Sequence, residues 1–347
     1  FLIAFPAGLL AQPTVVLVGP SGGEALTLKE AFDAINNGDI QGDPVNGEID
    51  LQIVDNTTES ATAVLYQSGY QGNSSYSLIR IYPTVSGLVI SGNLSGTIIE
   101  FNGADNVILD GRVNQTGSAD LIVTNTSTSA SSTIRFINSA QGNKVKYCYI
   151  KGSESNTSGG IIHFSTASSG TGNDGNTIEY NYITSDAAGR PVNAIYSSGT
   201  TDSENSGDTI RNNNIYNFFK HGSSSNGVFL SSNTTGWTIS GNSFYETASF
   251  APTADASFNT IQINNTSGTN FTVSGNFIGG SAASCGGTNP WTKTNANDNP
   301  FVAIYLNVGT GTVSNIQNNT IKYFNWSNSL NSNWTAIQVD AGAVDIG

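Results

Sequence analysis

Short runs of β-branched and aromatic residues recur along most of the chain. In most of them, a single residue separates two apolar ones. Seven runs share this form, and their leading residues are Ile134, Ile162, Ile195, Val228, Ile261, Ile304 and Ile337. Neighbouring leads are mostly 33 residues apart. Alternation with a period of two is typical of a β-strand with one buried face. The pattern therefore predicts one such strand in each repeat.

A second motif follows these runs after 11 to 16 residues and has an apolar residue three before, and another two after, a central Asn. The central positions are Asn181, Asn213, Asn242, Asn276 and Asn319, with Cys148 at the same place in an earlier copy. Equal positions in stacked strands lie about 4.8 Å apart, so these Asn side chains are expected to form an internal ladder. Cys148 is expected to end the ladder as a small buried thiol with a structural role.

A repeat of this length also occurs in helical repeat proteins such as ankyrin and TPR arrays. The runs here are too short, too β-branched and too often bounded by Gly and Asn for helices. The predicted fold is all-β, a right-handed parallel β-helix (solenoid) over residues 51–347 with coils of 33 residues in most repeats. A new coil begins at Ala343 and stops at Gly347, so the solenoid is expected to continue beyond the given C-terminus.

Residues 13–50 are expected to form an N-terminal cap with one short helix at about residues 27–37. Thr27 and Glu30 have the spacing of a capping box, and Gly38 follows as a stop signal. One apolar face is spaced at i, i+3, i+4 and i+7 and comprises Leu28, Ala31, Phe32 and Ile35. Such a helix would cover one end of the solenoid core.

Residues 1–12 are mostly apolar, with small residues near Ala11, and lack the basic segment that opens a signal peptide. We interpret them as the remnant of a secretory signal peptide with its cleavage site. The alternatives are a buried N-terminal strand, or an apolar segment that inserts into a neighbouring molecule of an extracellular assembly.

Composition and charge narrow the class of protein further. The formal net charge is −13, with only 12 Lys and Arg residues, which argues against nucleic-acid binding. No stretch reaches the roughly 20 apolar residues needed to span a bilayer. Only 11% of residues are charged, so amides and hydroxyls must keep the surface polar, as suits an extracellular or cell-surface protein. Cys148 and Cys285 have no metal-binding spacing, and the sequence leaves open whether they pair.

Several segments resemble a known family. Leu78–Thr84 (LIRIYPT), Val107–Gly117 (VILDGRVNQTG) and Asn205–Asn214 (NSGDTIRNNN) are similar to segments of large secreted β-helix proteins of Bacteroidetes. The resemblance covers most of residues 13–347. It implies a signal peptide, pectin-lyase-like coils, further modules of the same longer chain and a C-terminal signal for type IX secretion. It implies no particular activity.

Four tyrosines form the most distinctive pattern of candidate binding residues. Tyr147 and Tyr180 occupy equivalent places in adjacent coils, and so do Tyr149 and Tyr182. Strand alternation turns some of these rings outward, where stacked rings would offer a flat platform to sugar rings. The alternative is cross-strand stacking that only stabilises the sheet.

Two stacked loops also bring acidic residues to one side. The candidate cation or sugar cleft there comprises Asp174, Glu179, Asp202, Asp208 and Arg211, and Ca²⁺ is the cation that such oxygen ligands would favour. The alternative is solvated loop residues with partial ion pairing. His163 alternates with apolar neighbours and is expected to face outward, without a metal. The segment Asp208-Thr209-Ile210 fits the O-glycosylation pattern of Bacteroidetes, so the resemblance implies a glycan at Thr209.

The main hypothesis for function is a non-enzymatic extracellular β-helix module, acting as a rigid stalk or adhesin within a larger protein and binding a polysaccharide or a cell-surface partner. No catalytic residue, metal or cofactor is assigned. The alternatives are a polysaccharide lyase or glycoside hydrolase, which needs converging carboxylates or a base beside a cation, and a subunit of an extracellular assembly.

Overall fold

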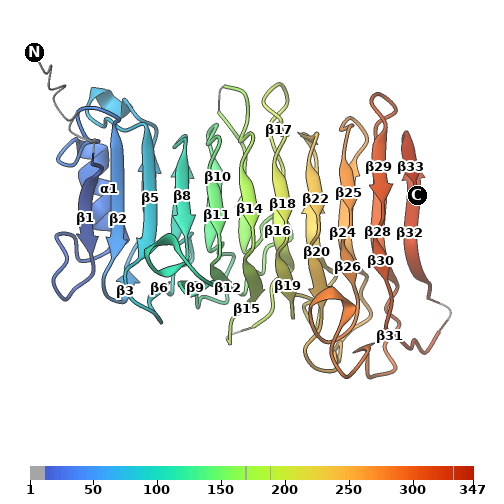
Figure 1. The fold of residues 1–347 in the computed structure, drawn as a ribbon. Coiled ribbons are helices and arrows are strands. Elements are labelled where there is room, and N and C mark those ends of the chain that lie inside the picture. The colour runs from blue at the N-terminus through green and yellow to red at the C-terminus, as the bar shows by residue number, and fades with distance from the viewer. Residues whose placement is uncertain (1–11, 169, 188, 331) are drawn as a thin grey trace, which may run out of the picture.

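The computed structural model describes residues 12–168, 170–187, 189–330 and 332–347. The chain winds into a parallel β-solenoid whose coils follow one another from the N-terminal to the C-terminal end (Figure 1). Within the described residues, three parallel sheets of 11, 9 and 9 strands run along the solenoid. The predicted all-β parallel solenoid is confirmed.

Each full coil gives one strand to each sheet, so neighbouring strands come from neighbouring coils. The first sheet contains β1 (Thr14–Val18), β2 (Glu48–Ile53), β5 (Leu78–Pro83), β8 (Val107–Asp110), β11 (Lys144–Lys146), β14 (Thr177–Glu179), β18 (Thr209–Arg211), β22 (Thr238–Ser240), β25 (Thr272–Ser274), β29 (Ser314–Gln317) and β33 (Val344–Ile346). The second contains β3 (Thr57–Glu59), β6 (Val89–Gly92), β9 (Ile122–Asn125), β12 (Tyr149–Gly152), β15 (Tyr182–Ser185), β19 (Asn214–Tyr216), β23 (Ser243–Tyr245), β26 (Phe277–Ile278) and β30 (Thr320–Ile321). The third contains β4 (Ala63–Tyr66), β7 (Ile99–Asn102), β10 (Ile134–Ile137), β13 (Ile162–Phe164), β16 (Asn193–Ser197), β20 (Ser225–Leu230), β24 (Phe258–Asn265), β28 (Phe301–Val308) and β32 (Trp334–Ala341). Two short pairs join loops of adjacent coils, β17 (Asn205–Ser206) with β21 (Thr234–Thr235) and β27 (Trp291–Thr292) with β31 (Phe324–Asn325).

Equal positions of the repeat stack in register and fill the interior. In the third sheet Ile134 is paired with Ile162, and Ile162 with Ile195. All three side chains are fully buried, as are Phe136 and Phe164, whose rings stack 4.5 Å apart. The residues between them point outward, as strand alternation requires. The core is therefore a set of apolar columns parallel to the solenoid axis.

An Asn ladder fills the bend between the first and second sheets. Its members are the five residues singled out by the repeat, Asn181, Asn213, Asn242, Asn276 and Asn319. The Oδ1 atom of Asn242 accepts the backbone N–H of Asn213 at 3.0 Å, and its Nδ2 donates to the carbonyl of Ile210 at 2.9 Å. Cys148 ends the column by donating its N–H to Asn181 Oδ1 at 2.9 Å. Burial raises the pKa of the Cys148 thiol, and Cys148 and Cys285 are both free and buried.

The helix α1 (Leu28–Asn37) packs on β1, β3 and β4 at the N-terminal end of the solenoid (Figure 1). Thr27 Oγ1 accepts the N–H of Glu30 at 3.2 Å, as the capping box predicts. A carboxylate from the solenoid also caps this end, because Glu59 of β3 accepts the N–H groups of Leu28 and Lys29 at 3.0 Å each. Gly38 ends the helix in the left-handed region, with φ 82°.

The solenoid begins earlier than residue 51. β1 and the first half of β2 lie within residues 13–50, and the two strands pair in parallel with Val16 opposite Leu51. Both of these side chains are buried, so the predicted cap contributes to the core as well as covering it. The predictions for residues 1–12 concern a segment that, apart from Gln12, lies outside the described residues. In the described part of the chain, no helix is long and apolar enough to cross a membrane.

Candidate functional site

The tyrosines form an outward-facing aromatic surface around the bend of adjacent coils. Tyr147 and Tyr149 flank the inward-pointing Cys148, and Tyr180 and Tyr182 flank Asn181 in the next coil. Two further rings, which the sequence analysis did not single out, continue it along the second sheet. We call the whole set the tyrosine face, and it comprises Tyr147, Tyr149, Tyr180, Tyr182, Tyr216 and Tyr245.

The six rings are arranged as three stacked pairs. The centroids of Tyr147 and Tyr180 are 4.9 Å apart with planes 5° from parallel. Tyr149 and Tyr182 stack at 4.6 Å and 14°. Tyr216 and Tyr245 stack at 5.1 Å and 6°. Face-to-face rings in register are a direct consequence of parallel pairing between equal positions.

The first pair carries a cation at one end and is open at the other. The guanidinium carbon of Arg112 lies 4.2 Å from the ring centroid of Tyr147, which is within the range of a cation–π contact. The same guanidinium forms an ion pair with the buried carboxylate of Asp110, with Nη2 and Oδ2 2.7 Å apart. Tyr180 is 41% exposed. Tyr180 is therefore the exposed end of this stack, with the ring of Tyr147 behind it.

The backbone under this pair is strained. Tyr147 and Tyr180 have φ values of 54° and 57°. The corresponding residues of four later coils also have positive φ, and they are Asn212, Gly241, Gly275 and Asn318. Gly and Asn adopt this conformation readily, whereas a bulky residue costs about 1 kcal/mol or more there. Two coils thus place Tyr where stability favours Gly or Asn, and such an outlier points to a functional role.

The second-sheet tyrosines influence one another's ionisation. Burial raises the pKa of Tyr245, and the neighbouring Tyr216 raises it further. The pKa of Tyr216 is raised by burial and then by Tyr149. Thr184 lies beside these rings, since it pairs in register with Tyr216. Tyr245 is buried, so solvent reaches the tyrosine face mainly at the rings of the earlier coils.

The structure corrects the predicted acidic cleft, because it does not bring these carboxylates together around a common space. Asp208 is fully buried, and its Oδ1 accepts the backbone N–H of Asn176 at 2.7 Å. Glu179 forms an ion pair with Arg211, whose Nε donates to Oε2 at 2.7 Å. Asp174 accepts the N–H and hydroxyl of Ser206 at 2.8 and 2.9 Å, whereas Asp202 is an exposed turn residue. Among the residues that the structure describes, no group of three or more His, Cys, Asp or Glu side chains is placed to hold a metal.

Asp208 instead belongs to a second internal ladder that the sequence analysis missed. Asn143 Nδ2 donates to Asn176 Oδ1 at 3.0 Å, and Asn176 Nδ2 donates to Asp208 Oδ1 at 3.0 Å. The other oxygen of Asp208, Oδ2, is buried without a hydrogen-bond partner. Burial raises the pKa of Asp208 well above its usual value, so the carboxyl replaces an amide here. The next residue, Thr209, is half-buried on the outer side of β18, and its glycosylation stays a prediction.

A small polar cavity of about 150 Å³ lies over the third sheet, and Arg135, Glu154 and His163 are among its lining residues. Arg135 and His163 are paired in register on β10 and β13, and Arg135 also forms an ion pair with Glu100 of β7. Burial, and secondarily the charge of Arg135, lowers the pKa of His163 to about 4, while burial raises the pKa of Glu154. His163 faces outward as expected. The repeat also aligns Arg135 with His163, which was the signal available for finding this cavity.

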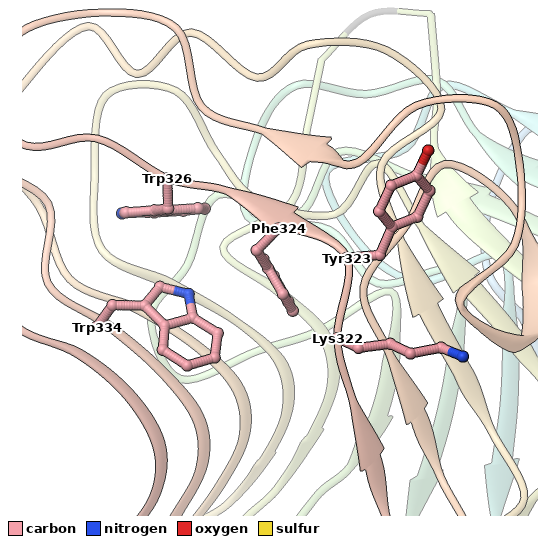
Figure 2. A pocket seen from close by; sticks show the side chains of 5 residues that line it. All are labelled: Lys322, Tyr323, Phe324, Trp326 and Trp334. Carbon is pink, nitrogen blue, oxygen red and sulfur yellow. The ribbon is translucent and has the colours of Figure 1, made fainter.

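An aromatic cavity of about 330 Å³ lies near β32 and is lined by Lys322, Tyr323, Phe324, Trp326 and Trp334. Figure 2 shows the rings of Phe324, Trp326 and Trp334 around an open space, with Tyr323 and Lys322 extending away from it. The rings of Phe324 and Trp334 meet edge to face at 5.2 Å, and Trp334 is 40% exposed. This cavity is a second aromatic surface that is open to solvent.

No family profile matches the chain, and no curated protein matches it in sequence. Two solved structures of PfbA, a surface adhesin of Streptococcus pneumoniae, are similar to it at 13% and 14% sequence identity. The first alignment covers 87% of this chain and 88% of the adhesin chain with a TM-score of 0.37. The second covers 91% and 95% with a TM-score of 0.35. Similarity at this level supports no conclusion about function, and the resemblance to Bacteroidetes proteins stays a prediction.

Proposed function

We propose that this chain is a non-enzymatic extracellular β-helix module that acts as a rigid stalk or adhesin and binds polysaccharide through its tyrosine face. The observation that carries the proposal is the strained, stacked pair Tyr147 and Tyr180. A pair kept only for stability would sit on relaxed backbone, as Tyr149 and Tyr182 do in their strands. Strain retained in two adjacent coils is accounted for by an interaction with something outside the chain.

The chemistry of the surface suits sugar rings. The axial C–H groups of a pyranose form an apolar face that packs on a flat aromatic ring, while its hydroxyl groups need donors and acceptors at the edge. Tyr180 supplies an open ring, and the ring of Tyr147 is stacked behind it. The further stacks of Tyr149 with Tyr182 and of Tyr216 with Tyr245 extend the aromatic rings over adjacent coils, so a linear polymer can contact more than one coil.

The charge of the chain favours neutral glycans over acidic ones. The net charge of −13 repels polyanions at long range. Near the tyrosine face, the cations Arg112 and Arg211 are already paired with Asp110 and Glu179. Lys151, which pairs in register with Thr184 on the second sheet, is then the main positive charge left there to meet a carboxylate or sulfate group.

The stalk role rests on the architecture itself. Each coil contacts its neighbours through three parallel sheets and through the Asn ladder, so the unit is stiff along its axis and adds length with each repeat. The low charge and the amide-rich and hydroxyl-rich surface support an extracellular location.

The test is affinity electrophoresis against cellulose-derived glucan, xylan and polygalacturonate with matched variants. The double substitution Tyr147→Gly and Tyr180→Gly removes the stack and leaves the residue that this backbone prefers, so the fold should be retained. Binding to a neutral polysaccharide should then be lost. Tyr70→Ala serves as the control, because Tyr70 belongs to a stacked pair with Tyr66 elsewhere on the solenoid. Equal retardation of the wild type and the double variant would contradict the proposal.

The polar cavity favours a second candidate, a polysaccharide lyase or glycoside hydrolase. A neutral His163, a Glu154 with a raised pKa and the cation Arg135 are a plausible base, acid and charge stabiliser in one cavity. Incubation with polygalacturonate and xylan, followed by absorbance of unsaturated products and by reducing-end assay, tests this reading. Activity that His163→Gln abolishes would favour the enzyme.

A further inference from the structure

A second polar cavity, of about 330 Å³, lies among three loops near the C-terminal end of the solenoid. Its walls come from the segment after β23, from the connection between β26 and β28, and from β31. Asn325 of β31 lines it, whereas the preceding Phe324 lines the aromatic cavity. Strand alternation turns these two side chains to opposite sides. We call this space the loop cavity, and its polar side chains include Thr247, Ser249, Ser281, Asn289, Thr292 and Asn325.

The loop cavity is built by the longest of these coils. Asn226 and Asn259, which pair in register, are 33 residues apart, whereas the paired Asn264 and Asn307 are 43 residues apart. The additional residues lie between β26 and β28, in a connection that contains η3 (Ala283–Cys285) and β27. The loops beside β31 extend further from the solenoid than those of earlier coils (Figure 1). Stacking of coils does not require this extension, and binding groups are concentrated in such loops on a rigid scaffold.

Hydrogen bonds hold the walls of the loop cavity in place. The N–H and the hydroxyl of Thr247 both donate to Oδ1 of Asn217, at 3.0 and 3.1 Å. Thr292 pairs in register with Asn325, and its carbonyl accepts the N–H of Phe250 at 2.7 Å. The polar groups of the walls are therefore positioned before a ligand arrives, which lowers the entropic cost of binding.

The charge in the wall is compensated. Among the described residues that line the cavity, Glu246 alone is charged. Its side chain is fully buried, and its Oε1 and Oε2 accept from Nη1 and Nη2 of Arg190 at 2.7 and 2.8 Å. The ion pair thus anchors the start of the first loop and leaves no net charge for a ligand. A cation would need free carboxylates and an anion would need free Lys or Arg side chains.

The rim offers both donors and acceptors to a ligand. Three lining side chains make no hydrogen bond within the described residues, and they are Ser249, Asn289 and Asn325. Ser281 Oγ accepts the N–H of Asn289 at 3.2 Å and keeps its own proton to donate. Thr292 Oγ1 donates to the carbonyl of Pro290 at 3.1 Å and keeps lone pairs to accept.

We infer that the loop cavity binds one neutral pyranose unit, either as a free monosaccharide or as the end of a glycan chain. Sugar hydroxyls donate and accept at once, which matches the exposed amides of Asn289 and Asn325 and the hydroxyl of Ser249. Ala248 and Pro290 supply a small apolar area for the C–H groups of the ring. The volume is at the lower end of the range of small-molecule sites, about 300 to 1,000 Å³. The inference is independent of the tyrosine face, which offers stacked rings to a length of polymer.

The test is saturation-transfer-difference NMR of the full chain with D-glucose, D-galactose, D-mannose, D-xylose and, as a charged comparison, D-glucuronate. At least one neutral sugar should receive saturation, and glucuronate should receive less. Cellotriose separates the two sources of ligand, because a chain end in the cavity confines the transfer to one terminal residue. Transfer to none of the neutral sugars, or equal transfer to glucuronate, would overturn the inference.

Matched variants locate the binding. Ser249→Trp fills the cavity from an exposed position, and Asn289→Ala combined with Asn325→Ala removes two exposed rim amides. Each should raise the dissociation constant of the bound sugar about tenfold or more. Ser86→Trp, at an exposed serine of another coil, should leave the constant and the circular dichroism unchanged.

The double variant Tyr147→Gly and Tyr180→Gly separates this inference from the proposed function. It should keep the affinity for the monosaccharide while it loses retention by polysaccharide. Loss of monosaccharide binding in this variant, with full binding in Ser249→Trp, would overturn the inference and leave the tyrosine face as the sugar site. The reverse result, together with polysaccharide retention in the tyrosine variant, would overturn the proposed function alone.

Discussion

Tyr147 and Tyr180 stack with their planes 5° from parallel, and both residues stand on left-handed backbone that later coils give to Gly or Asn. The stack and the strain have opposite effects on stability. Aromatic stacking across strands contributes up to about 1 kcal/mol, while the left-handed conformation costs a bulky residue about 1 to 2 kcal/mol. Because both residues carry the cost of the left-handed conformation and share one stack, the pair as a whole does not stabilise the fold, which leaves ligand contact as its main effect.

This balance predicts different outcomes for two neighbouring tyrosines. Tyr180→Gly should change the free energy of unfolding by less than about 1 kcal/mol, because relief of strain offsets the lost stack. Tyr182→Gly, in a regular strand of the second sheet, should cost about 1 to 2 kcal/mol, because it loses the stack and gains only chain flexibility. Urea denaturation followed by circular dichroism measures both, and equal losses would argue against strain at Tyr180.

A substitution in the middle of the Asn ladder should lower the free energy of unfolding. Asn242→Ala removes the partners of three buried polar groups, the N–H and Nδ2 of Asn213 and the carbonyl of Ile210. We expect a loss of about 3 kcal/mol or more in the free energy of unfolding, since each buried unsatisfied group costs about 1 to 3 kcal/mol. Asn315→Ala, on the outer side of the first sheet, should change it by less than about 0.5 kcal/mol. Similar losses in both variants would show that the ladder adds nothing.

Asp208 should make the protein less stable as the pH rises. Its pKa is raised by burial in the folded state, so the folded protein keeps a proton that the unfolded chain releases above about pH 4. The contribution is complete below that pH and is lost as the pH rises toward the folded pKa. Asp208→Asn should remove this dependence and raise the free energy of unfolding at pH 7 by about 1 kcal/mol or more, because an amide can donate where Oδ2 now has no partner. A less stable variant at pH 7 would contradict this account.

His163 should have the opposite effect on the pH dependence of stability. Its pKa is lowered to about 4 by burial, so the unfolded chain binds a proton near pH 6.5 that the folded protein excludes. Stability is therefore complete above about pH 6.5 and falls as the pH drops toward 4. The difference in unfolding free energy between the wild type and His163→Gln should vary with pH in this window and be constant above it. NMR titration of the His163 ring measures the pKa directly.

The repeat allowed the fold and the first Asn ladder to be predicted from the sequence. In a parallel solenoid each coil contacts only its neighbours, so the positions that face the core recur at a fixed spacing and the period alone aligns them. Ile134, Ile162 and Ile195 are aligned in this way, and so are Asn181 and Asn213. The helix after Thr27 was equally accessible, because its capping residues and its apolar face are local.

Which loop residues are buried, and what they contact, became clear only in the tertiary structure. Asp208 looked like a surface carboxylate, since its neighbours are polar and the loop lengths vary. Its burial depends on Asn176, which meets it from the previous coil. The buried amine of Lys293 likewise meets Asn328, which lies 35 residues further along the chain in a loop of the next coil. These loops carry no periodic signal. Sequence periodicity specifies what every coil shares. What one pair of loops does alone follows from contacts that form only once the coils are stacked.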